Sequence, residues 1–190
     1  MEQDEPIDAP KKEKEEKKKK KASRTAETMY RTTLSNLVRL SEMADRKAGL
    51  MVSINSIIIS IMTSFLVHEY AANPKLLFPI AVLLLVSLLT ITFALLSTKP
   101  SLKHQNNTAI DKIDLLFFGD YVTLSLEDYK KAMKEMIKKD GQLRDNLIEN
   151  IYAQGKVIDH KFKLLSISYT IFMYGFPVAI LSFLLMLLVG

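Results

Sequence analysis

Two groups of charged residues stand directly before two long apolar stretches of the chain, and their side chains could bind an anion. The first group is Asp45, Arg46 and Lys47, and the second is Lys156, His160, Lys161 and Lys163. Lysine and arginine form charge-assisted hydrogen bonds with phosphate. The same residue types are also common at membrane surfaces, because their long side chains reach water from the edge of a bilayer. Composition alone leaves both interpretations open.

Residues that carry most enzyme chemistry are missing or scattered. The chain has no cysteine, which excludes disulfides, thiol catalysis and cysteine-ligated metal sites. Its three histidines, His68, His104 and His160, have no carboxylate at metal-binding spacing, and no nucleophile motif or phosphate-binding glycine loop is present. We therefore expect no enzyme activity, no metal and no cofactor.

Three apolar stretches, residues 48–67, 76–97 and 164–189, are long enough to cross a bilayer as helices. About twenty helical residues span the roughly 30 Å hydrocarbon core. Such spans explain the formal net charge of +5 without nucleic-acid binding, because positive residues collect on the cytoplasmic side of membrane proteins. The sequence predicts an all-α integral membrane protein with three transmembrane helices.

The distribution of lysine and arginine predicts the orientation. Of the 26 such residues, thirteen precede the first span, twelve lie between the second and third spans, and only Lys75 lies in the short turn after the first. Because basic loops remain in the cytoplasm, we expect a cytoplasmic N-terminus, a cytosolic middle and an external C-terminus. The sequence thus predicts a multi-pass membrane protein with its N-terminus in the cytoplasm.

The segments outside the spans are expected to be largely helical. Residues 1–22 have no apolar face and are predicted to be a disordered charged tail. Residues 23–47 show helical periodicity and continue without a breaker into the first span. The middle, residues 98–163, contains the sequence DLLFFGDY at positions 114–121 and a helix that begins after Ser125, an N-cap residue with Asp128 three positions later. A final helix continues into the third span.

Small residues recur on one face of the first span. They are Gly49, Ser53, Ser56, Ser60 and Ser64. Small residues allow transmembrane helices to approach closely, so packing is the simpler interpretation of this serine face. The alternative is that the face lines a wet path when the protein is active. The second span has its own set, which is Ser87, Thr90, Ala94 and Ser97.

Three stretches in order, ADRKAG, LLFFGDYVTLSLEDY and IENIYAQGKVIDHKFKLLSISY, extend this interpretation. They resemble the transmembrane effectors of the Pycsar antiphage system, the PycTM family, and the similarity covers about residues 36–177. It implies that a partner cyclase makes a pyrimidine cyclic mononucleotide, cyclic CMP or cyclic UMP, on infection. The effector would bind this nucleotide and impair the inner membrane, which stops phage replication by abortive infection.

The resemblance also suggests how the charged groups are used. A cyclic mononucleotide needs a cation for its phosphate, and the candidates are Lys47, Lys161 and Lys163. It also needs a flat surface for its base, and the candidates are Phe118 and Tyr121. Asp45 would orient Lys47 or an arginine. Because three helices cannot enclose a useful aqueous path, we expect a homo-oligomer packed through the serine face. The alternative function is a non-gated membrane anchor or scaffold that recruits a soluble partner to its cytosolic helices.

Overall fold

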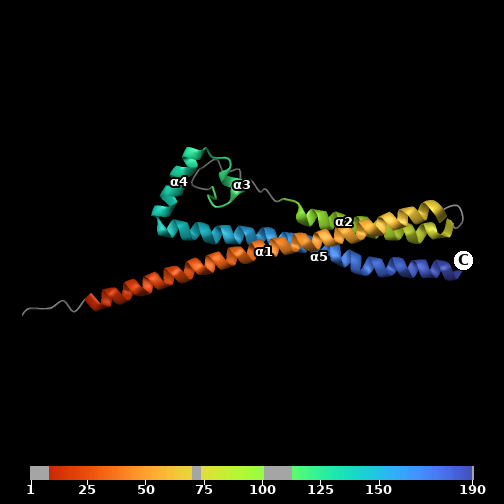
Figure 1. Ribbon diagram of the computed structural model, residues 1–190, viewed down its shortest axis with the longest axis horizontal. Helices are drawn as coiled ribbons and strands as arrows, with labels where there is room; N and C mark the ends of the chain where they lie inside the picture. The colour runs from red at the N-terminus through yellow and green to blue at the C-terminus, as the bar shows by residue number, and fades with distance from the viewer. Residues whose placement is uncertain (1–8, 70–73, 101–112, 190) are drawn as a thin grey trace, which may run out of the picture. The chain divides into compact units, whose positions relative to one another are not determined.

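The computed structural model describes residues 9–69, 74–100 and 113–189 of the chain (Figure 1). Every regular element in these ranges is helical, which confirms the predicted all-α fold class. The elements in chain order are α1 (Ala9–Glu69), the short 3-10 helix η1 (Pro74–Leu76), α2 (Leu77–Thr98), α3 (Phe118–Tyr121), α4 (Leu126–Lys138) and α5 (Asp140–Val189).

The chain divides into two compact units. One, which we call the membrane unit, comprises Arg39–His104 and Ala153–Gly190, and the other, the polar unit, comprises Met1–Val38 and Gln105–Tyr152. Helices α1 and α5 contribute residues to both units, because each runs unbroken across the boundary.

Helix α1 begins at Ala9, so residues 9–22 are helical where a disordered tail is expected from sequence, and residues 1–8 of that predicted tail lie outside the described residues. The difference has a local cause. Alanine, glutamate and lysine are strong helix formers, and they make up almost all of residues 9–22. The absence of a buried face therefore did not imply the absence of helix.

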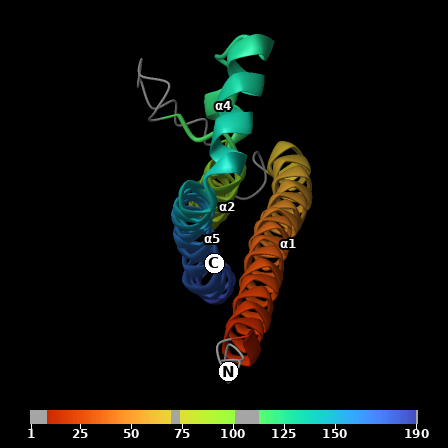
Figure 2. The same cartoon turned by 90° about the vertical axis from the view of Figure 1, so that its left-hand side faces the viewer.

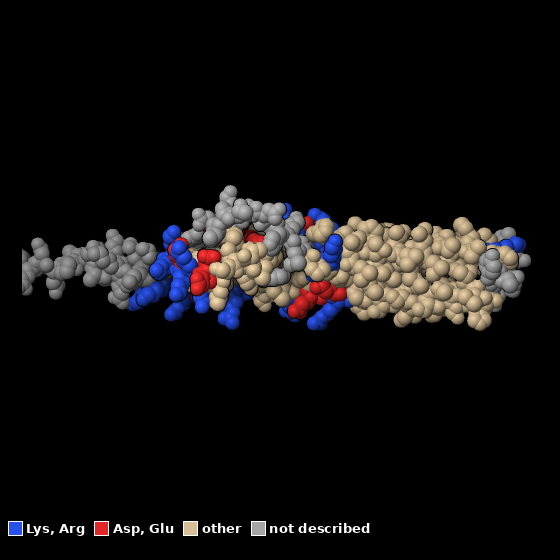
Figure 3. Space-filling model, turned by 90° about the horizontal axis from the view of Figure 1, so that it is seen from above, with Lys and Arg blue, Asp and Glu red and all other residues tan. Residues whose placement is uncertain are grey.

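The described residues contain three helices that are long and apolar enough to cross a membrane, as the sequence predicts. They lie in α1, in the segment formed by η1 and α2, and in α5. Figure 3 shows a continuous face of the membrane unit without Lys, Arg, Asp or Glu, bordered by charged side chains. A surface of this kind is suited to hydrocarbon rather than to water.

The core of the membrane unit is a cluster contributed by all three of its long helices, which run side by side (Figures 1 and 2). Its buried members are Ala44, Ala48 and Met51 of α1, Ala94 of α2 and Leu165 of α5. Spacings of four and three residues place the α1 members on one face of that helix. Alanine at three of the five positions lets the helix backbones approach closely.

One helical turn beyond this cluster, the same three faces carry polar residues. Asn55 of α1, Thr90 of α2 and Ser168 of α5 are each fully buried. The hydroxyl of Ser168 donates to the carbonyl of Thr90 at 2.8 Å, which joins α5 to α2. The amide of Asn55 donates to the carbonyl of Met51 on its own helix, whereas its Oδ1 has no hydrogen-bond partner among the described residues. The interior of the membrane unit is thus partly polar.

Candidate functional site

Lys161 of α5 makes polar contacts with two residues of α1 at the charged end of the membrane unit. Its Nζ donates to both carboxylate oxygens of Asp45 on α1, at 2.9 and 3.0 Å. It also donates to the hydroxyl of Ser41, one turn earlier on α1, at 3.0 Å. A lysine ammonium has three protons, so these three contacts use its full donor capacity. The charged groups predicted from sequence therefore meet here, through a pair separated by 116 positions.

Burial differs between the two partners of this ion pair. The Lys161 side chain is 14% exposed, whereas the Asp45 side chain is 44% exposed. A shielded ammonium depends on its counterion more than a half-exposed carboxylate does, because water can solvate the carboxylate. Asp45, expected from sequence to orient Lys47 or an arginine, thus has Lys161 as its partner here.

The remaining charged residues of this region are more exposed. Lys47 lies on the solvent-accessible side of α1, and Arg46 is 4.0 Å from Glu42 in a surface pair along the same helix. Lys163 donates to Asp159, one turn earlier on α5, at 2.7 Å. This hydrogen bond lowers the pKa of the Asp159 carboxyl, and the positive charge of Lys163 acts in the same direction. Lys47 and Lys163 are accessible to a ligand, whereas Lys161 is occupied.

The candidate base-stacking residues belong to the polar unit. Tyr121, in α3, has its ring centroid 5.0 Å from that of Tyr129 in α4, and the two ring planes are tilted by 39°. The backbone of Phe118 is also in α3, but its side chain lies outside the described residues. The structure thus places the candidate lysines in one unit and the candidate aromatic residues in the other.

The segment that carries Tyr121 is fixed by a carboxylate that the sequence analysis did not single out. Asp114 Oδ1 accepts from the backbone N–H of Leu116 at 2.8 Å, and its Oδ2 accepts from the Asn150 side chain at 2.9 Å. Asn150 is only 3% exposed, so this contact attaches the segment to α5. The available signal was a polar asparagine within an otherwise apolar helical face. Gly119 completes the turn, because a Cβ there would lie 2.5 Å from the Phe117 ring.

Replacing Asn150 with alanine should loosen this turn without unfolding the helices. The carboxylate of Asp114 would lose a buried donor, a change that typically costs about 1–3 kcal/mol. Hydrogen exchange at the Leu116 amide should accelerate by roughly ten- to a hundredfold. Glu149→Ala, at the exposed neighbouring position, is the matched control and should leave this exchange rate unchanged. Equal exchange in the two variants would contradict the anchoring role of Asn150.

The serine face of α1 lies away from the core of the membrane unit. Its members Gly49, Ser53, Ser56, Ser60 and Ser64 are all exposed in the single chain. The hydroxyl of Ser60 donates to the carbonyl of Ser56, within the same helix. The small residues of the second span behave differently, because Ser87, Thr90, Ala94 and Ser97 are all buried. Sequence reasoning found both sets, but only the second packs within the chain.

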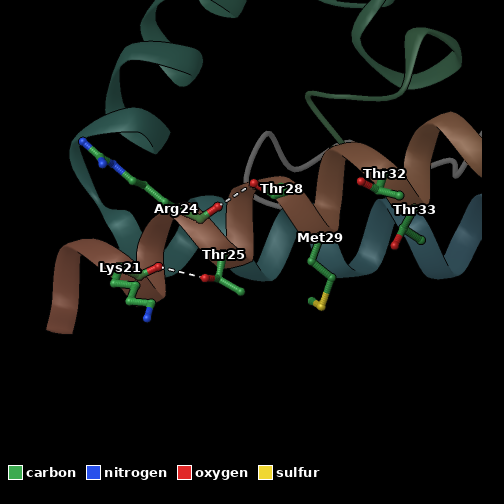
Figure 4. A pocket seen from close by; sticks show the side chains of 7 residues that line it. All are labelled: Lys21, Arg24, Thr25, Thr28, Met29, Thr32 and Thr33. Atoms are coloured by element: carbon green, nitrogen blue, oxygen red, sulfur yellow. Dashed lines mark hydrogen bonds between the residues drawn. The ribbon is translucent and has the colours of Figure 1, made fainter.

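A shallow recess on α1 in the polar unit is shown in Figure 4. It is lined by Lys21, Arg24, Thr25, Thr28, Met29, Thr32 and Thr33. The hydroxyls of Thr25 and Thr28 donate to carbonyls of the preceding turn, those of Lys21 and Arg24. All seven residues come from a single helix, so the recess is an open surface rather than an enclosed ligand site. The described part of the chain also holds no group of three or more His, Asp or Glu that could bind a metal ion.

Comparison with known proteins assigns most of the chain to one family. Residues 28–189 match the model of a protein family described as the Pycsar effector protein domain. No curated protein and no solved structure matches the chain. The family match includes all three membrane-spanning segments and the ion pair between Asp45 and Lys161. The chain therefore belongs to the Pycsar effector family and is a multi-pass membrane effector of antiphage defence.

Proposed function

We propose that the protein binds a pyrimidine cyclic mononucleotide, cyclic CMP or cyclic UMP, and responds by impairing the bacterial inner membrane. Infection would then end in the death of the infected cell before phage replication is complete. A partner cyclase would supply the nucleotide. The N-terminus and the polar unit would lie in the cytoplasm, where the nucleotide is made, in line with the excess of lysine and arginine in these segments.

The observation that carries this proposal, beyond family membership, is the continuity of α1 and α5. Each of these helices contains polar residues of one unit and a membrane span of the other. A change in the packing of their charged segments therefore has a direct covalent route into the bilayer. A ligand shifts such an equilibrium only by the difference between its affinities for the two packings.

We propose that the ligand phosphate is bound by lysines at the charged end of the membrane unit. Lys47 and Lys163 are exposed cations, and Lys161 is a shielded one. The aromatic candidate, Tyr121, has a partly exposed ring and belongs to the polar unit. Impairment of the membrane would require several copies, because three packed helices have no room for an aqueous path. We assign the contact between copies to the serine face of α1, which is exposed in the single chain.

Direct binding tests this function. Detergent-purified protein should bind radiolabelled cyclic CMP or cyclic UMP saturably, and cyclic AMP should compete at least about tenfold more weakly, since a purine exceeds a pyrimidine pocket. Expression together with a pyrimidine cyclase should be toxic, whereas expression alone should not. A different result would be a folded protein that binds neither pyrimidine nucleotide and is equally toxic with and without the cyclase. Such a protein would instead be a non-gated membrane scaffold for a soluble partner.

A further inference from the structure

The two side chains of the ion pair between Lys161 and Asp45 are buried to different extents, which a purely structural contact does not require. The Lys161 ammonium is held by two carboxylate oxygens and one hydroxyl, and its side chain is largely withdrawn from water. A cation in this position must keep an anionic partner, because an unpaired shielded charge is strongly destabilising. Asp45 is under no such constraint, since nearly half of its side chain already reaches solvent.

We propose that Asp45 is an internal substitute for the ligand phosphate, and that the nucleotide activates the protein by replacing Asp45 on Lys161. The inference rests on the proposed function and specifies how its ligand acts. The chemical match is close. The phosphate of a 3′,5′-cyclic mononucleotide is a diester, with one negative charge shared by two non-bridging oxygens. The carboxylate that Lys161 now binds also has one charge and two oxygens.

The exchange would change the packing of the two helices as well as the occupant of Lys161. Asp45 and Ser41 are both on α1, so all three hydrogen bonds of the ammonium join α5 to α1. Once a phosphate binds Lys161, these contacts are lost and Asp45 is solvated by water. The carboxylate and the phosphate cannot both occupy the ammonium, because their charges repel each other. Ligand binding and the closed α1–α5 contact are therefore mutually exclusive.

Competition of this kind predicts opposite effects from the two partners. Asp45→Asn removes the competing charge and should tighten binding of cyclic CMP or cyclic UMP about tenfold, within the range of usual coupling energies. Lys161→Gln removes the cation and should weaken binding at least about tenfold. Glu42→Gln is the matched control, because it neutralises an exposed carboxylate of the same helix, which pairs with Arg46 at the surface. It should leave the affinity within about twofold of the wild-type value.

A charge-exchanged variant tests the ion pair between α1 and α5 separately from nucleotide binding. Asp45→Lys combined with Lys161→Asp retains an ion pair between the helices but moves the ammonium to α1. It should keep the closed packing and lose the nucleotide response. The packing can be measured by spin-label distances, because the chain has no cysteine and labels can be placed at the exposed positions Met43 and Ala153. Without nucleotide, Asp45→Asn should give the longer distance that the wild type shows with nucleotide.

The outcomes distinguish this inference from the function on which it rests. If the wild type binds a pyrimidine nucleotide but Asp45→Asn changes neither the affinity nor the spin-label distance, the exchange at Lys161 is wrong and the function stands. Normal nucleotide binding by the charge-exchanged variant would also show that the exchange at Lys161 is wrong and leave the function standing. If the wild type binds neither nucleotide, the proposed function fails and the phosphate exchange fails with it. Tighter binding and a longer distance in Asp45→Asn, together with loss of binding in Lys161→Gln, support the exchange.

Discussion

Gly175→Leu should disrupt the packing of α5 against α2 and destabilise the membrane unit by about 3 kcal/mol, the upper part of the usual range for overpacking. A Cβ added at Gly175 would lie 2.6 and 2.7 Å from the two methyl carbons of Val86 and 3.3 Å from its Cβ. Carbon atoms do not pack at the two shorter distances. The methyl groups of a helical valine cannot move away easily, because one χ1 rotamer is strongly preferred. The helices themselves must separate.

Smaller substitutions show whether the contact between Gly175 and Val86 causes the loss of stability. Gly175→Ala should already destabilise the unit, and the added change Val86→Ala should recover most of the loss, since it removes both methyl groups that block the new Cβ. Gly155→Ala is the control, because no atom lies within 4 Å of a Cβ at that position of the same helix. The measurement is the free energy of unfolding in mixed micelles. Equal stability of the two alanine variants would show that α2 and α5 are not in close contact at Gly175.

The spans and their helical extensions were predictable because their signals are local. Twenty uncharged residues after Lys47 define a helix that enters lipid, whatever surrounds it. Ser125 and Asp128 form the predicted helix start, since the Ser125 hydroxyl accepts from the Asp128 N–H at 3.1 Å and donates to its carboxylate at 2.7 Å. These features depend on neighbours within four positions, which the sequence displays directly.

Contacts between distant segments were not predictable in the same way. Periodicity places Asp45 on a face of α1 and Lys161 on a face of α5, but it does not state that these two faces meet. The inward face of the first span was ambiguous for a related reason. In lipid, an apolar face and a small-residue face are both acceptable exteriors, so the small residues of the serine face did not show whether that face packs within the chain. In the structure the buried face of the first span carries Ala48 and Asn55 instead.

The double variant Ser56→Leu with Ser60→Leu should abolish cyclase-dependent toxicity while leaving membrane insertion intact. Both serines are exposed in the single chain, so leucine there does not collide with the core of the membrane unit. Leucine is also as compatible with lipid as any residue, and insertion should be unaffected. Two copies of α1 that meet through small side chains could no longer approach, because each leucine holds the backbones apart.

The control is Ile54→Leu with Ile61→Leu, two exposed positions of the same span that lie off the serine face. This variant should remain toxic with the cyclase. Fractionation measures insertion, and chemical cross-linking in membranes measures association between copies. Toxicity of the serine variant at the wild-type level would exclude a role for this face. Loss of both toxicity and cross-linking, with insertion retained, would place the defect between copies of the chain, since the substituted positions are exposed in a single copy.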